Sequence, residues 1–253
     1  MKKYFVLINI YWQRALAYRF TVLAYRVGEI LEVLILVVMW SAIYGDQQMI
    51  RGFTLREMIT YVLIGNLFNM VVRNWSHQIV SQQIKEGTLS TFLVQPINYF
   101  HYFVFRELGR HSLPTFFSIM SQLMVIVFFY RTIIINADMY VLSLIAVMLM
   151  LAFVTELLIS FLVGSIAFWT DETDGIYATV DRLRRFFSGG YFPLNLLPAL
   201  FLRASFFLPF AYSIYIPTQL YLGKLDIAGG LHGLLIQMIW IAALYGIIQL
   251  VWR

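Results

Sequence analysis

The sequence contains no cysteine and little charge. The absence of cysteine from all 253 residues excludes disulfide bonds, zinc–thiolate sites, iron–sulfur clusters and thiol catalysis. Charged residues make up 12% and hydrophobic residues 61% of the chain, whereas a soluble domain carries about 25% charged residues. A single soluble core of this size cannot hide so much apolar surface. The composition therefore excludes a soluble globular domain and a disordered chain, and it predicts an integral membrane protein.

Several catalytic motifs are also missing. The Gly223-Lys224 pair is followed by Leu225, so the chain has no phosphate-binding P-loop. The patterns His-Glu-x-x-His and Gly-x-Ser-x-Gly are absent, and the histidines are scattered singly. We therefore expect no enzyme, no metal site and no cofactor in this chain. The net charge of +5 indicates positive cytoplasmic loops rather than a surface for nucleic acid.

Long apolar runs predict six membrane crossings, since a spanning helix needs roughly 20 mostly apolar residues. The expected spans are residues 21–44, 58–80, 111–130, 139–169 and 230–252, with one more crossing within 176–222. Prolines interrupt that last region and disfavour a continuous helix. We expect a helix over 176–187, followed by a region, 191–222, of short helices that re-enter the outer leaflet. One full helix with an interfacial loop is the alternative.

The first 19 residues predict an amphipathic helix on the membrane surface. Tyr4, Tyr11 and Tyr18 fall on one helical face, and basic residues lie nearby, as is typical of the membrane interface. An uncleaved start to the first span is the alternative. Six crossings place both termini on one side, and the density of basic residues at 14–19 and 85–110 favours the cytoplasm. We expect an all-α, multi-pass protein of the plasma membrane, that is, a bacterial or archaeal cytoplasmic membrane.

Residues 81–96 form a polar segment between the second and third spans. Ile84, Leu89 and Phe92 keep a helix-compatible spacing, Gly87 can end one helical turn, and Thr88 can cap the next. A short amphipathic helix at the cytoplasmic face is suited to docking into a groove of a partner. An idle interfacial helix fits the same pattern.

The pattern Lys-Glu-Gly-Thr-Leu…Leu…Pro at residues 85–96 resembles the cytoplasmic coupling segment of the ABC-2 type transporter permeases. The resemblance extends over nearly the whole chain. It includes Trp-Ser-Ala-Ile-Tyr at 40–44, Phe-Trp at 168–169 and Tyr-Phe-Pro-Leu-Asn-Leu-Leu-Pro at 191–198. Among the branches of that family, the chain is most similar to permeases of about this length that occur as two unlike subunits beside one ATPase.

This resemblance implies a single ABC-2 transmembrane domain over residues 1–253, working as an exporter permease by alternating access. ATP and Mg would be bound by a separate ABC ATPase, and a second permease subunit, like or unlike, would complete the dimer. Membrane lipid is the further partner, and nucleic acid is not one. The substrate would be amphipathic or lipid-linked and would leave the cytoplasm or the inner leaflet. The residues implied in ATPase coupling are Lys85, Glu86, Gly87, Thr88, Leu89 and Leu93.

Two other functional classes stay open. An ion-coupled secondary transporter or channel would use Glu156 and the buried arginines directly. A membrane-embedded lipid enzyme is the other class. An adjacent ATPase gene would distinguish the exporter from both.

Charged side chains within the expected spans are candidates for a functional site, because a charge at bilayer depth costs a few kcal/mol. Arg26, Glu29 and Glu32 share one helical face and can partly neutralise each other. Asp181 stands at i+3 and i+4 from two arginines and can neutralise one of them. The candidate residues of a substrate path or dimer seam are Arg26, Glu29, Glu32, Arg73, Glu156, Arg182, Arg184 and Arg185.

Two interpretations of these charges stay open. In one, they form structural ion pairs, for example Arg185 with Glu29 or Glu32 across the seam, together with arginines that snorkel to the cytoplasm. In the other, they line a polar path that accommodates an anionic headgroup.

Overall fold

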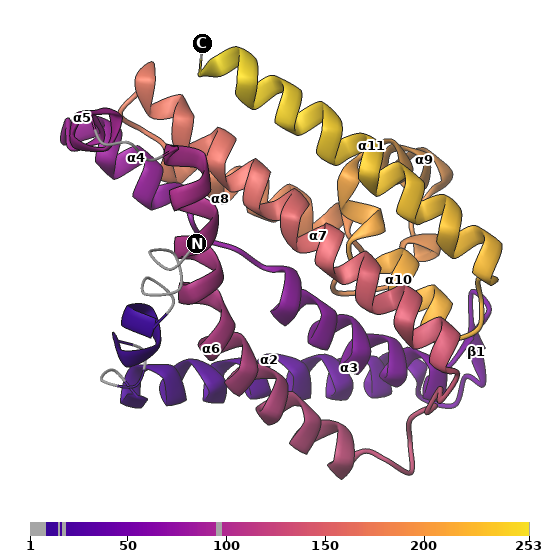
Figure 1. Cartoon of the computed structure of the whole chain (residues 1–253). Coiled ribbons are helices and arrows are strands. Elements are labelled where there is room, and N and C mark those ends of the chain that lie inside the picture. Colours follow the sequence, from indigo (N-terminus) through magenta and orange to yellow (C-terminus); the bar gives the residue numbers. More distant parts are fainter. Residues whose placement is uncertain (1–8, 15, 17–18, 95–97, 253) are drawn as a thin grey trace.

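The structure is a computed structural model that describes residues 9–14, 16, 19–94 and 98–252 (Figure 1). Within these residues, five helices are long and apolar enough to cross a membrane, and a bent pair of shorter helices raises the number to six. The only strands described are two short strands of two residues each, which pair as a hairpin. The expected all-α membrane fold is therefore confirmed.

The elements follow one another along the chain with short connections. They are α2 (Arg19–Tyr44), β1 (Met49–Ile50), β2 (Phe53–Thr54), α3 (Leu55–Val72), α4 (His77–Lys85), α5 (Leu89–Leu93), α6 (Tyr99–Phe128), α7 (Met139–Ser165), η1 (Ile166–Phe168), α8 (Asp174–Phe187), η2 (Leu194–Leu196), α9 (Ala199–Phe207), η3 (Pro209–Tyr212), α10 (Tyr215–Tyr221) and α11 (Ile227–Val251).

The second span is broken, which the sequence did not predict. Helix α3 begins with a capping box, in which the Thr54 side chain accepts from the Glu57 N–H and Glu57 accepts from the Thr54 N–H. It ends before Arg73, whose backbone is extended, and α4 begins only at His77. Arg73 lies within the second span, as expected, but at the point where its helix is interrupted. Residues 73–76 are a non-helical break, and such backbone at membrane depth must be buried in protein or line a cavity.

Helix α6 begins earlier than expected, at Tyr99 rather than near residue 111. The Asn98 side chain caps it by accepting from the His101 N–H at 3.1 Å. The fully buried Glu107 lies between Arg106 and Arg110, each within 2.8 Å of one of its oxygens. These charge-assisted bonds let the helix continue through a stretch that hydropathy alone assigns to a loop.

The fifth crossing is divided among several short elements. Helix α8 has 14 residues, about 21 Å at 1.5 Å per residue, which is too short for a hydrocarbon layer of about 30 Å. It ends at a turn where Gly189 adopts φ +73°, held by a 2.7 Å hydrogen bond from the Tyr61 hydroxyl to the Gly189 carbonyl. Beyond it, α9 and the η3–α10 segment meet at a bend of 80°. A broken span and a re-entrant loop share this form, so the re-entrant element stays a prediction.

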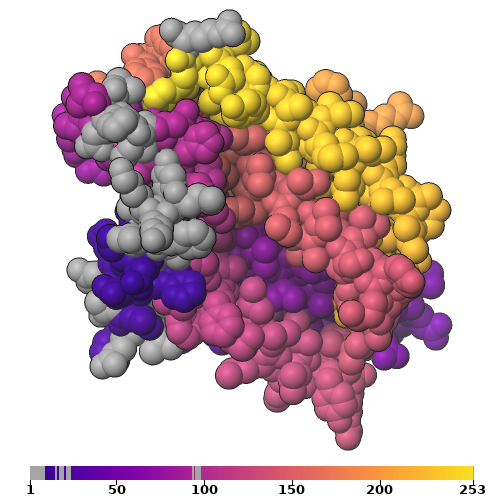
Figure 2. Space-filling model, in the orientation of Figure 1, coloured from indigo at the N-terminus to yellow at the C-terminus, as the bar shows by residue number. Residues whose placement is uncertain are grey.

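Two clusters of buried apolar side chains stabilise the helices. The larger joins α2, α3, α7 and α10 and includes Val33, Tyr61 and Met148. The smaller joins α4, α6, α7 and α11 and includes Phe161 and Leu244. Helix α7 belongs to both clusters and lies against α11 along its length (Figure 1). Figure 2 shows α3, in purple, largely covered by α6 and α7 on the near face.

The expected amphipathic segment at 1–19 falls partly outside the described residues. Residues 9–14 are helical and lie against α6. The Trp12 indole donates to the Ser112 hydroxyl at 2.8 Å, and Arg106 Nε donates to the Tyr11 hydroxyl at 2.8 Å. These contacts place aromatic rings beside basic and polar groups, as the interfacial interpretation requires.

Candidate functional site

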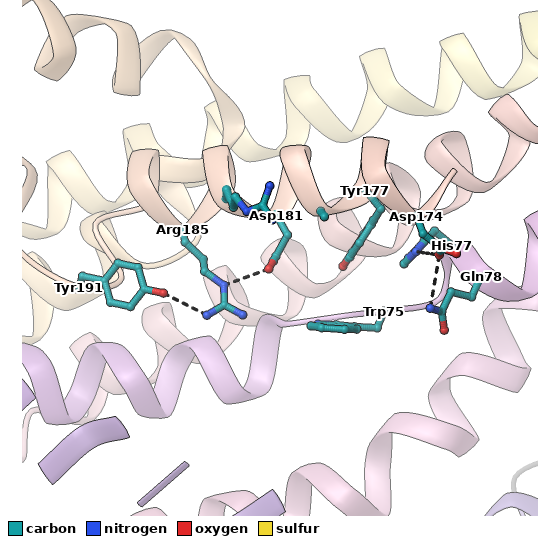
Figure 3. A pocket seen from close by; sticks show the side chains of 10 residues that line it. Trp75, His77, Gln78, Asp174, Tyr177, Asp181, Arg185 and Tyr191 are labelled. Carbon is teal, nitrogen blue, oxygen red and sulfur yellow. Dashed lines mark hydrogen bonds and ion pairs between the residues drawn. The ribbon is translucent and has the colours of Figure 1, made fainter. Parts of the chain in front are cut away.

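Two cavities, of about 450 Å³ and about 440 Å³ and lined by charged and aromatic side chains, lie where the break in the second span meets α8, α2 and α6. The first, shown in Figure 3, lies between α8 and the start of α4, and Tyr191 closes one side. The second is lined by α2, α3 and α6. Trp75 and Gln78 line both cavities, so the break forms their common wall. Within the described residues, no three metal-ligating side chains lie together.

Asp181 organises the charges of α8. Its Oδ1 accepts from Arg184 at 3.0 Å, and its Oδ2 accepts from Arg185 Nε at 3.0 Å. Arg185 also donates to the Tyr191 hydroxyl at 3.0 Å, as Figure 3 shows, and its Nη1 lies 3.9 Å from Glu32 Oε1. The Arg185–Glu32 contact is made within one chain. Arg185 is therefore held by local partners and by the first span together.

Glu156 and Arg184 lie behind the cavities rather than in them. Glu156 Oε2 is 3.8 Å from Arg184 Nε, and both side chains are almost completely buried. Arg184 also donates to the Asn69 side chain at 3.0 Å, which ties α8 to α3. This arrangement is that of a buried structural ion pair, whose removal from one side leaves an uncompensated charge.

Arg182 differs from its neighbours. Its side chain is exposed and lines the first cavity, and it makes no hydrogen bond or ion pair with any residue that the structure describes. Arg182 can point into the cavity although Arg184 does not, because side chains one or two positions apart on a helix point in different directions. Of the three arginines expected at this site, Arg184 is buried, Arg185 is paired at the cavity wall, and Arg182 is open to the cavity.

The first-span charges line the second cavity. Arg26 Nη1 lies 2.7 Å from Glu29 Oε2, the i+3 pair that the spacing predicts, and Glu32 lies further along the same wall. Arg73 reaches the cavity from the break, with its guanidinium carbon 4.7 Å from the centre of the Trp75 ring. The fold thus gathers the expected charges of α2, the break and α8 around two adjoining spaces.

Sequence reasoning missed the aromatic side of this site. The rings of His77 and Tyr177 are stacked with centroids 3.6 Å apart, and His77 Nε2 is 3.1 Å from Asp174 Oδ1. The Tyr177 hydroxyl donates to the Asn74 carbonyl, which satisfies one carbonyl of the non-helical break. The sequence does contain a signal for this site: the run Asn-Trp-Ser-His at 74–77 is unusually polar for a membrane span.

The coupling segment comprises the end of α4 and the short α5. Gly87 adopts φ +69° and ends the first piece, as expected. Thr88 precedes α5, but its hydroxyl donates to the Gln83 carbonyl at 3.4 Å and does not cap the helix, so that expectation is wrong. Lys85 donates to the Asp171 carbonyl and to the Thr173 hydroxyl, and it fastens the segment to the loop before α8.

Fewer of the expected coupling residues are exposed than the sequence predicts. Leu89 is 7% exposed and belongs to the smaller apolar cluster, so it does not face a partner. Glu86 and Thr88 are exposed, and Val94 is 84% exposed. The Leu93 side chain lies outside the described part of the structure.

An aromatic cluster connects the coupling segment to the last helix. Phe92 of α5 lies 4.7 Å, centre to centre, from Tyr102, and Tyr99 stacks on Trp252 at 5.2 Å. The Tyr99 hydroxyl donates to Gln83, and the Trp252 indole donates to Ser165. A displacement of α5 would therefore reach α6, α7 and α11 through packed rings.

Comparison with known families identifies the class of protein. The sequence model of the family described as ABC-2 family transporter protein matches residues 30–253, which is most of the chain. The chain therefore belongs to the ABC-2 transporter family and is a multi-pass membrane protein. A comparison with curated proteins gives no match.

Proposed function

We propose that the chain is the membrane-spanning permease subunit of an ATP-driven exporter that moves an amphipathic or lipid-linked substrate out of the cytoplasm or the inner leaflet. Membership of the ABC-2 family supports this assignment. A separate ABC ATPase would bind ATP and Mg, and a second permease subunit, like or unlike, would complete the transporter. Both termini would face the cytoplasm of a bacterial or archaeal cell.

The observation that carries the proposal is the pair of cavities with charged residues in their walls at the broken second span. Charges at bilayer depth are costly and usually mark a transport path or a subunit seam. Here Arg73, Arg182 and Glu32 face open space rather than a closed core. If these charges only stabilised the helix bundle, they would not need cavities of this size beside them.

Coupling to the ATPase would proceed through α4 and α5. The exposed side chains Glu86, Thr88 and Val94 offer a docking surface. Helix α4 lies against α7, where the carbonyl of His77 and the side chain of Val80 closely approach Gly164. Because α4 and α7 contact each other directly, movement of the docked segment would be transmitted to α7 and to the loop before α8.

The test separates docking from folding. In the double variant Glu86→Ala/Val94→Ala, the loss of two exposed contacts should weaken ATPase docking about tenfold or more. ATP hydrolysis stimulated by the permease should then fall, while basal hydrolysis by the free ATPase stays unchanged. Met49→Ala, which removes an exposed apolar side chain from the hairpin, is the matched control.

Two results would contradict the proposal. One is wild-type stimulation by the double variant at normal expression. The other is transport by the purified chain, without any ATPase, driven by an ion gradient. The second result would favour the secondary-transporter class instead.

A further inference from the structure

Within the described residues, most charges at the two cavities neutralise one another. Glu29 pairs with Arg26, and Asp181 pairs with Arg185 and Arg184. Three further pairs involve charged groups at the cavity walls: Glu32 with Arg185, Asp174 with His77, and Arg110 with Glu107. Each acidic group at the cavity walls therefore has a cationic or imidazole partner.

Two cations are left over, one in each cavity. Arg73 lines the second cavity and Arg182 the first, and neither makes a hydrogen bond or ion pair with any described residue. The Nε atom of Arg73 is buried without a hydrogen-bond partner. A buried donor that is left unsatisfied costs about 1–3 kcal/mol. A bound acceptor would remove that cost.

Trp75 stands at the junction of the two cavities. Its ring contacts the Arg73 guanidinium, lies 6.1 Å from Tyr177, and forms part of both cavity walls. The side chain is 45% exposed although it lies between two helices of a membrane span. Figure 3 shows the ring lying flat along the first cavity, below Tyr177. An exposed indole at this place offers an apolar wall beside the Arg73 guanidinium, and Arg182 lines the first cavity together with it.

We infer that Arg73 and Arg182, which line the two cavities that share Trp75 as a wall, bind the phosphate group of an anionic amphiphile, with the indole packing against the apolar part next to that phosphate. The inference rests on the proposed function, since it names the class of substrate that the path would accept. Guanidinium groups present forked donors that match the several oxygens of a phosphate. It also reassigns the roles expected from the sequence, because Arg184 and Arg185 are already occupied by carboxylates of this chain.

The test measures binding of dodecyl phosphate to the full chain in phosphatidylcholine nanodiscs, without ATPase or ATP. Binding is followed as a saturable change in tryptophan fluorescence, which should be lost in Trp75→Phe. Each of Arg73→Gln and Arg182→Gln should raise the apparent Kd about tenfold, since a hydrogen bond to a charged group is lost. Arg182→Lys, which keeps the charge, should retain most of the affinity. Arg203→Gln removes an exposed arginine of α9, away from both cavities, and should bind as the wild type does.

Three outcomes would overturn the inference. The first is unchanged affinity in the double variant Arg73→Gln/Arg182→Gln with a normal melting temperature. The second is equal binding of the cationic dodecyltrimethylammonium. The third is inorganic phosphate binding as tightly as dodecyl phosphate, which would assign the site to a free anion. Because no ATPase is present, failure of this binding test is distinct from failure of the exporter proposal.

Discussion

Buried ion pairs decide which arginines of α8 are structural. Arg184 is held by Asp181, Asn69 and Glu156 on three different helices, and its side chain is 2% exposed. Arg182, two residues earlier, is exposed and has no partner among the described residues. Their difference is one of helical phase, since one points into the bundle and the other into a cavity. Substitutions at Arg184 should therefore destabilise the fold far more than substitutions at Arg182.

The prediction at this scale concerns the Glu156–Arg184 pair. Arg184→Met should destabilise the chain by about 3–5 kcal/mol, because it leaves a buried carboxylate without its cation. Adding Glu156→Gln removes that charge and should recover part of the loss. Melting temperature in detergent is the measurement, and the exposed Arg182→Met serves as the control with an effect within about 0.5 kcal/mol. A double variant no more stable than Arg184→Met would show that the pair is not coupled.

At the scale of elements, α4 is the part of the second span that packs most closely against α7. The break at residues 73–76 separates it from α3, and close approach at Gly164 joins it to α7. A Cβ at Gly164 would stand 2.6 Å from Val80 Cβ and 2.7 Å from the His77 carbonyl oxygen. Since the oxygen belongs to the backbone, the helices themselves would have to separate.

We therefore expect Gly164→Ala to destabilise the chain by about 1–3 kcal/mol, the usual cost of overpacking. Stimulation of the partner ATPase should fall as well, because α4 would shift against α7. The control is Gly246→Ala in α11, where a Cβ meets nothing within 4 Å and helix propensity improves by up to about 1 kcal/mol. Thermal melting and stimulated ATP hydrolysis of the two variants give the comparison. Equal melting temperatures for both would contradict the close contact.

At the scale of the whole molecule, the fold separates two polar ends. The hairpin, the loop between α6 and α7, and the start of α11 meet at one end, where Lys224 pairs with Glu57 at 2.8 Å. The coupling segment and the loop before α8 meet at the other end. The basic residues near the coupling segment favour the cytoplasm for that second end, and we predict this orientation.

The absence of cysteine makes this orientation directly testable. Ile135→Cys, in the α6–α7 loop, and Thr88→Cys, in the coupling segment, each introduce one exposed thiol. A membrane-impermeant maleimide should label Ile135→Cys in intact cells and Thr88→Cys only after permeabilisation. The unmodified chain should take up no label. The reverse pattern would invert the topology.

The sequence by itself determined the membrane class, the approximate spans and the family. These follow from hydropathy and from local motifs, which need no knowledge of distant contacts. Pairs within one helix, such as Arg26 with Glu29 and Asp181 with two arginines, were equally accessible because helical spacing fixes them. The turn at Gly87 was accessible for the same local reason.

Only the tertiary structure decided the break at residues 73–76, the burial of Leu89 and the identity of the unpaired arginines. Each depends on residues far apart in the chain, such as Glu156 with Arg184, Tyr177 with the Asn74 carbonyl, and Tyr99 with Trp252. A hydropathy profile averages over a helix and cannot tell which side chain meets a carboxylate across the bundle. The two cavities exist because α2, α6 and α8 meet at a break in the second span, and packing between helices alone fixes that meeting.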